Sequence, residues 1–151
     1  MQTEQRTEIA AEFCQAIYEL RYRLRKLFQA KLKEANISIS LEVLEVMKFL
    51  QRQNGLNQQE LADVLFKDKS SITYIIDNMV KAGLATRHED AADRRNKQIF
   101  LTDKAHQLRE QLNPLADACM LALAEDIAID DIADSLKMIN KMNNSLSAII
   151  G

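Results

Sequence analysis

Residues 57–83 read NQQELADVLFKDKSSITYIIDNMVKAG and decide the fold. Asn57 stands before a helical pattern with Glu60 three residues on, which is the spacing of a capping box and predicts a short helix over 57–65. A second helix is expected over 68–83, because Gly83 is a natural residue to follow a helix and the apolar positions before it share one face: Ile72, Ile75, Ile76 and Met79. Two helices joined by so short a segment predict a helix-turn-helix.

The outer face of the second helix is rich in side chains that form hydrogen bonds. At about 100° per residue, the polar positions lie opposite or beside the apolar arc, and their hydroxyls and amides can bind base edges and phosphates. Tyr74 can also pack against thymine methyl groups. An ordinary solvated face is the alternative interpretation of such a helix taken alone. The residues expected to contact DNA are Lys69, Ser70, Ser71, Thr73, Tyr74 and Asn78.

A β-hairpin is predicted over 84–102. Two segments of strand character, Leu84–Glu89 and Lys97–Leu101, flank a very polar stretch, so the hairpin has a charged tip. A protruding pair of arginines can reach a narrow minor groove, and Asp93 is expected to orient one guanidinium through a charge-assisted hydrogen bond. The alternative is a charged turn that its own ion pairs keep soluble. The candidate residues of this wing are Asp93, Arg94 and Arg95.

Long amphipathic helices are predicted at both ends of the chain. Apolar residues recur at three- and four-residue steps from Ile9 to about Leu32, and Ile132, Ile139 and Leu146 fall seven apart. We expect these helices to form a homodimer, although they could instead cover the central core. A further helix is predicted, with Thr102 or Asp103 as its cap, to about Asp126, with a kink or restart at Pro114.

Length and composition place these elements in one mainly α-helical domain with a small β-hairpin. The chain has 151 residues, 3 Gly and 1 Pro, and no apolar stretch long enough to span a membrane. Its polar first residues lack the features of a secretory signal, so we expect a cytoplasmic protein. The net charge of −2 argues mildly against nucleic-acid binding, but residues 105–151, with three Lys or Arg against seven Asp or Glu, carry the acidity.

No catalytic or metal-binding pattern stands out. Cys14 and Cys119 match no metal or CxxC spacing, and His88 and His106 have no neighbouring ligand at metal spacing. The sequence also lacks a nucleophile-and-base signature and a phosphate-binding glycine loop. We therefore expect no enzyme activity, no cofactor and no metal.

Residues 57–104 resemble the winged helix-turn-helix of MarR-type bacterial transcription regulators. The resemblance lies in 61–65 (LADVL), 68–73 (DKSSIT), Asp77, Lys81, Gly83-Leu84 and Arg87, and then in 93–96 (DRRN) and 99–102 (IFLT). It implies a winged helix-turn-helix homodimer that binds a roughly palindromic site. It also implies dimerisation helices over 1–35 and 105–151, a DNA-binding lobe over 36–104, and Arg95 as the more constant wing arginine.

The chain departs from the family pattern at several positions. Phe66 stands where the family usually has a turn glycine, Lys67 where it has an apolar residue, and Tyr74 where it often has arginine. Asp77 would repel phosphate if its charge were free, so we expect a basic partner for it, one from the wing being the first candidate.

The resemblance favours a dimeric repressor that binds double-stranded DNA and is released by a small aromatic or anionic effector. Two alternatives remain open: a thiol-based peroxide sensor that acts through Cys14, and a helical protein-interaction module without operator binding. An inert, buried Cys14 is the competing interpretation of that cysteine.

Overall fold

The computed structural model describes residues 1–151 and divides them into two compact units, Met1–Leu115 and Ala116–Gly151. The first unit contains α1 (Gln2–Glu34), α2 (Leu41–Arg52), β1 (Leu56–Asn57), α3 (Gln58–Leu65), α4 (Lys69–Lys81), β2 (Ala85–Glu89), β3 (Lys97–Leu101) and the first part of α5 (Asp103–Ala124). The second contains the rest of α5 and α6 (Ile129–Ile150). None of these helices has the length and apolar character needed to cross a membrane.

Helices α3 and α4 form the predicted helix-turn-helix. Asn57 caps α3, its side chain accepts from the Glu60 N–H, and the Glu60 carboxylate accepts the Asn57 N–H in return, which completes the capping box. Helix α4 ends two residues before Gly83, which has a φ of 73° and so supplies the left-handed residue that terminates many helices. The mainly helical winged fold expected from the sequence is confirmed.

The turn between α3 and α4 contains a phenylalanine in a backbone conformation that favours glycine. Phe66 adopts a left-handed conformation, with φ 53° and ψ 43°, and its side chain is 95% exposed. An L-residue with a Cβ pays a steric cost in this region, and glycine does not. The chain therefore keeps the backbone geometry of a glycine turn with a phenylalanine in place.

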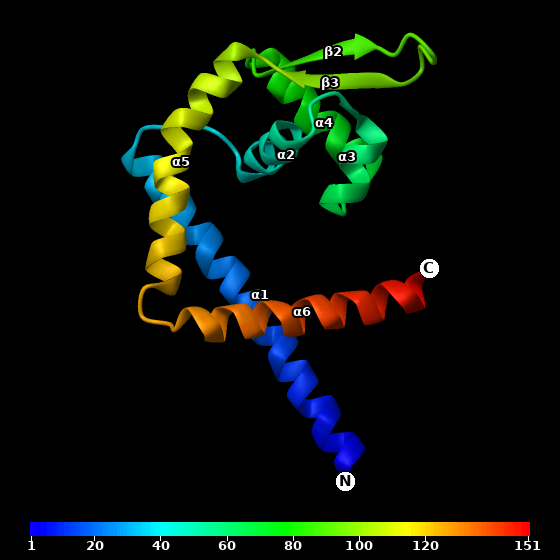
Figure 1. Ribbon diagram of the computed structural model, residues 1–151. Coiled ribbons are helices and arrows are strands. Elements are labelled where there is room, and N and C mark those ends of the chain that lie inside the picture. The colour runs from blue at the N-terminus through cyan, green and yellow to red at the C-terminus, as the bar shows by residue number, and fades with distance from the viewer. The chain divides into compact units, whose positions relative to one another are not determined.

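The wing belongs to an antiparallel sheet with the strand order β1-β3-β2. In Figure 1 the β2–β3 hairpin projects beyond α3 and α4. Ile99, at the centre of β3, pairs with Leu56 on one side and with Arg87 on the other. The hairpin was predicted from the sequence but β1 was not, because its two residues form a strand only where β3 lies beside them. Just before β1, Gly55 has a φ of 83° and lies under the Phe100 ring.

The core of the first unit lies between α2, α3, α4 and the inner face of the sheet. The predicted apolar arc of α4 is buried, and side chains of α2 and β3 meet it. A mutually packed set of this kind holds α4 rigidly while its other face stays exposed. The largest fully buried side chains of this core are Val46, Met47, Leu50, Leu61, Ile72, Ile76, Met79 and Ile99.

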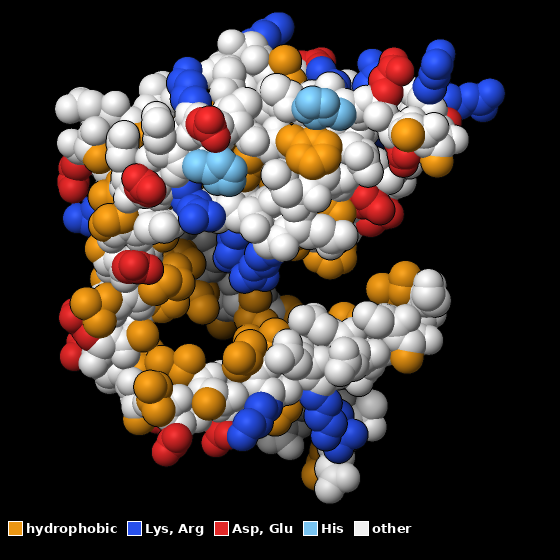
Figure 2. Space-filling model, turned by 45° about the horizontal axis from the view of Figure 1, so that its top comes forward, with side chains coloured by type: hydrophobic (Ala, Val, Ile, Leu, Met, Phe, Trp, Pro, Cys, Tyr) orange, Lys and Arg blue, Asp and Glu red, His pale blue; other side chains and the backbone are white.

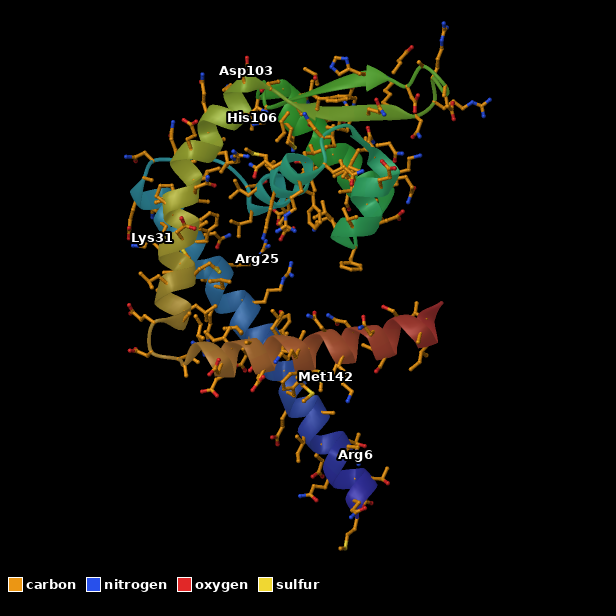
Figure 3. The ribbon with its side chains drawn as sticks, in the orientation of Figure 1. Arg6, Arg25, Lys31, Asp103, His106 and Met142 are labelled. Carbon is orange, nitrogen blue, oxygen red and sulfur yellow. The ribbon has the colours of Figure 1, made fainter.

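Helix α5 continues through Pro114 without a break and ends at Ala124, so of the kink or restart expected at Pro114 the restart is wrong. The ring removes the N–H that would bind the Glu110 carbonyl, but Pro114 and Glu110 are both exposed, and water can satisfy that carbonyl. At its beginning, the Thr102 hydroxyl accepts from the Ala105 N–H, in agreement with the predicted cap. Asp103 and His106 mark this first part of α5 beside the wing in Figure 3.

The terminal helices α1 and α6 expose much of their apolar surface. Leu32 is the one buried residue of α1, and α6 has none. In α1 the exposed apolar residues are Ile9, Ile17, Tyr18, Leu20 and Tyr22. In α6 they are Ile129, Ile132, Leu136, Met138, Met142, Leu146, Ile149 and Ile150.

Candidate nucleic-acid interface

Helix α4 presents the six predicted contact residues on its solvent-facing side and flanks. Lys69, Ser70, Tyr74 and Asn78 are exposed, with Tyr74 at 69%, and Ser71 and Thr73 are half-buried. All six lie on a helix whose opposite face is fully packed. The structure thus brings them together on one rigid element.

Asp68, which was not among the residues predicted from the sequence to contact DNA, organises the first turn of α4. Its carboxylate caps the helix by accepting from the Ser71 N–H at 2.8 Å, and it also accepts from the Ser70 and Ser71 hydroxyls, the latter at 2.7 Å. These hydrogen bonds, first from Ser70 and then from Ser71, hold the pKa of Asp68 well below its usual range. Both serine protons are therefore used inside the protein, and each hydroxyl presents lone pairs outward.

Asp77 has the basic wing partner that its position required. Nη2 of Arg87, on β2, donates to Oδ1 of Asp77, on α4, and this is the closest ion pair of the lobe. The side chain of Arg87 is only 23% exposed, whereas that of Asp77 is 47% exposed. The negative charge on the outer face of α4 is thus neutralised within the protein.

Arg87 also begins a hydrogen-bonded chain that ends on Thr73. Its Nε donates to Gln58 Oε1 at 3.2 Å, and Gln58 Nε2 donates to Thr73 Oγ1 at 2.8 Å. The Thr73 hydroxyl in turn donates to the Lys69 carbonyl at 2.9 Å. These contacts link strand β2 of the wing, the first residue of α3 and helix α4. The partners are separated in sequence by 15 positions in one hydrogen bond and by 29 in the other.

The tip of the wing leaves both arginine side chains free. Arg94 and Arg95 are exposed and form no ion pair. The expected guanidinium contact of Asp93 is wrong: Asp93 Oδ1 accepts from the backbone N–H of Arg95 at 3.0 Å, because the tight turn places that amide nearer than either guanidinium. Blue side chains gather at the projecting end of the upper lobe in Figure 2.

Lys67 lies beside a hollow of about 580 Å³ between the start of α2 and α4. The hollow is also lined by Glu42, Ser70, Tyr74 and Asn78. The pKa of Glu42 is lowered by its own backbone N–H at the helix start, then by Arg25 and by the charge of Lys67. The replacement of an apolar turn residue by Lys67 therefore places its charge near a carboxylate rather than in the core.

Arg25 ties α1 to α2. Its guanidinium binds Glu42 at 2.9 Å and Glu45 at 3.0 Å, and Arg21 adds a second contact to Glu45 at 3.3 Å. Figure 3 shows Arg25 on α1, along the part of the helix that approaches α2. These ion pairs connect the N-terminal helix to the lobe that carries α4.

The remaining candidate groups lie apart from this face or carry no ligand geometry. His88 accepts or donates a hydrogen bond with Thr86 at 3.0 Å, and its ring meets Phe100 edge-on at 5.1 Å. Cys14 is exposed on α1 and Cys119 is buried. No group of His, Cys, Asp and Glu has the arrangement of a metal site.

Comparison with known proteins connects this arrangement to one family. The MarR family model matches residues 38–96. The regulator TtmR of Methylorubrum extorquens (strain PA1), described as an HTH-type transcriptional regulator, is 26% identical over 105 residues. The match covers 70% of this chain and 53% of TtmR, so the chain spans about half the length of that relative.

Solved structures share the fold over nearly the whole chain. A MarR transcriptional regulator from Methanosarcina mazei Go1 has a TM-score of 0.79 at 24% identity and covers 90% of this chain and 99% of its own. Reduced AbfR bound to DNA has a TM-score of 0.77 at 19% identity, with full coverage of both chains. The repressor CouR, bound to a 23-mer DNA duplex, has a TM-score of 0.76 at 22% identity and covers 85% and 89% of the two chains.

Proposed function

We propose that this chain, whose winged helix-turn-helix is that of the MarR family, is a DNA-binding regulator of transcription that recognises a pseudo-palindromic operator as a homodimer. One observation carries the proposal. A polar, exposed face of α4 lies next to a projecting hairpin with two unpaired guanidinium groups, Arg94 and Arg95, on a tightly packed lobe. A rigid helix of this kind suits the major groove, and the hairpin suits the adjoining minor groove.

The charge on the proposed DNA-facing surface supports this assignment despite the net charge of −2. The ion pair with Arg87 neutralises Asp77, while Lys69, Arg94 and Arg95 stay exposed without a carboxylate partner. Phosphate affinity depends on such local cations, because their binding releases counterions from the duplex.

The exposed apolar surface of α1 and α6 supports a homodimer. Large apolar side chains repeat along both helices, and a folded monomer rarely leaves so many exposed together. The seven-residue spacing of Ile132, Ile139 and Leu146 suits helix packing against a second copy. The dimer would carry two α4 helices, which matches a site with two half-sites.

Release by an effector is the proposed control. A hollow of about 500 Å³ in the first unit lies between the segment 36–40, the end of α4 and the beginning of α5. Its lining is mostly apolar, with Lys104 as the one cation, and Lys104 Nζ keeps donors beyond the one bound to the Ala82 carbonyl. A small aromatic anion fits that chemistry, and binding there would release DNA if it favoured a position of α4 unsuited to the operator.

Oxidation of Cys14 is a second proposed form of control, because this cysteine is exposed on α1. In the single chain the Cys14 thiol is exposed, so peroxide can reach it wherever the second copy leaves it uncovered. If Cys14 were the switch, the Cys14→Ser protein would stay on DNA under oxidant. Release of the Cys14→Ser protein by peroxide would remove Cys14 from the mechanism.

The central experiment is fluorescence anisotropy of the full chain against a labelled duplex from upstream of its own gene. A shuffled duplex of equal composition is the control, and both are titrated at several salt concentrations. We expect tighter binding to the upstream duplex, with affinity that falls steeply as salt rises. Equal, weak binding to both duplexes would favour a module that docks a protein instead.

A further inference from the structure

Thr73 is fixed by three successive hydrogen bonds whose directions are unambiguous. Arg87 can only donate, so the Gln58 amide must turn its oxygen toward Arg87 and its NH₂ group toward Thr73. An NH₂ group can only donate, so Thr73 Oγ1 must accept from it at 2.8 Å. The Thr73 proton is left for the Lys69 carbonyl at 2.9 Å.

These contacts use the Thr73 proton and one of the two lone pairs of its hydroxyl, and they leave the methyl group without a partner among them. Threonine in a helix divides between two rotamers because its hydroxyl can bind a carbonyl of the preceding turn, and Gln58 adds a second contact that favours one of them. The hydroxyl oxygen then has a donor partner and an acceptor partner inside the protein. A hydroxyl so engaged has no proton for a phosphate or a base oxygen.

We propose that Thr73 reads thymine through its methyl group, and that Gln58 and Arg87 are positioning residues that hold it in this state. Apolar contact with the thymine 5-methyl group is one of the standard forms of major-groove recognition. The inference rests on the proposed function, because it requires α4 to lie in the major groove. It replaces the expectation from sequence that the Thr73 hydroxyl binds base edges or phosphates.

The test uses the full chain and a duplex selected by it from a randomised pool. Thymines of the selected duplex are replaced by uracil, which lacks only the 5-methyl group. Each duplex tested carries this change at one position, made in both half-sites. At the position read by Thr73 we expect the wild-type affinity to fall about fourfold per half-site, the loss of one buried methyl group. Thr73→Val keeps the methyl group, so its affinity should also fall when this thymine is replaced by uracil. Thr73→Ser lacks the methyl group, so its affinity should be the same for thymine and uracil at this position.

The positioning role has its own readout, which is the ratio of thymine to uracil affinity. Gln58→Ala should lower that ratio because Thr73 regains its second rotamer, and Gln59→Ala, one residue along the same helix and outside the chain of contacts, should not. An unchanged ratio in Gln58→Ala overturns the positioning role. A thymine-to-uracil affinity ratio of one at every position of the wild type would overturn the reading of thymine by Thr73. A ratio above one that Thr73→Ser retains would overturn it as well. A pool in which no sequence is enriched would count against the proposed function itself.

Discussion

Arg87 on the wing strand β2 is paired with Asp77 on α4, so the wing and the helix beside it share one ion pair across ten residues of sequence. A free carboxylate of Asp77 would repel phosphate on a DNA-facing surface. The ion pair with Arg87 neutralises that charge. The same guanidinium binds Gln58, which makes Arg87 the residue that joins β2, α3 and α4.

Replacing Arg87 with alanine should weaken operator binding about fivefold, because the uncovered charge of Asp77 repels phosphate by about 1 kcal/mol in a water-like medium. Asp77→Asn in the same chain should restore most of the affinity. Anisotropy titrations of the two single variants and the double variant form the cycle that measures the coupling. Strictly additive losses would show that Arg87 acts other than through Asp77, either by its own contact with DNA or through Gln58.

The strained turn at Phe66 predicts a stabilising substitution. Phe66→Gly should raise the free energy of unfolding by about 1 kcal/mol relative to Phe66→Ala, since alanine keeps the cost of a Cβ in the left-handed region and glycine does not. The phenyl ring is 95% exposed, so either change removes little buried area. Urea unfolding measures both variants, and equal stabilities would contradict the assigned strain.

Gly55 and Gly83 allow the steric cost of an added Cβ to be compared at two positions of positive φ. Both have positive φ, but a Cβ at Gly55 would lie 2.8 Å from Phe100 Cζ, whereas one at Gly83 would lie no closer than 3.7 Å to Lys104. Gly55→Ala should therefore cost about 1 kcal/mol more than Gly83→Ala in urea unfolding, which is the overpacking term. Adding Phe100→Leu should reduce the excess. If the excess persists when leucine replaces the ring, the Phe100 contact is not its cause.

The pKa of Asp68 links its cap to pH. Because the folded pKa is lowered from the model-peptide value of 3.8, the cap's contribution to stability is fully present above that value and is lost as the pH falls through the folded pKa. Asp68→Asn keeps a capping oxygen but does not titrate, so its stability should fall less than that of the wild type between pH 5 and pH 2. The control is Asp63→Asn, which removes an equal charge from α3 outside this cap. Parallel pH profiles for wild type and Asp68→Asn would contradict the prediction.

Local chemistry explains which features the sequence could predict. The start of α3 followed from Asn57 and Glu60, which satisfy each other within one helical turn, and the end of α4 followed from Gly83. Such signals depend on neighbours in sequence. The faces of α4 followed in the same way from the spacing of its apolar residues.

Features that depend on contacts between distant residues were missed. Strand β1 exists only because β3 lies beside it, and the role of Gln58 appears only when Arg87 and Thr73 are brought to it. The contact of Asp93 was misassigned because the geometry of its turn, rather than its charge, decides which donor lies nearest. The continuity of α5 through Pro114 was missed as well; Pro114 and Glu110 are both exposed there, so water can satisfy the Glu110 carbonyl.

The wing arginines provide the most direct test of contact between the wing and DNA. Arg95 is exposed and unpaired, so Arg95→Ala should leave folding unchanged, weaken operator binding, and reduce the slope of log affinity against log salt by about one. Lys141→Ala removes an equal charge from α6 and controls for net charge; its slope should match the wild type. Because each neutralised phosphate adds nearly one to the slope, this measurement separates a bound guanidinium from one that only contributes to the general field. A wild-type slope in Arg95→Ala, with Arg94→Ala showing the reduction instead, would move the phosphate contact to Arg94, and wild-type slopes in both would exclude the tip of the wing from the interface.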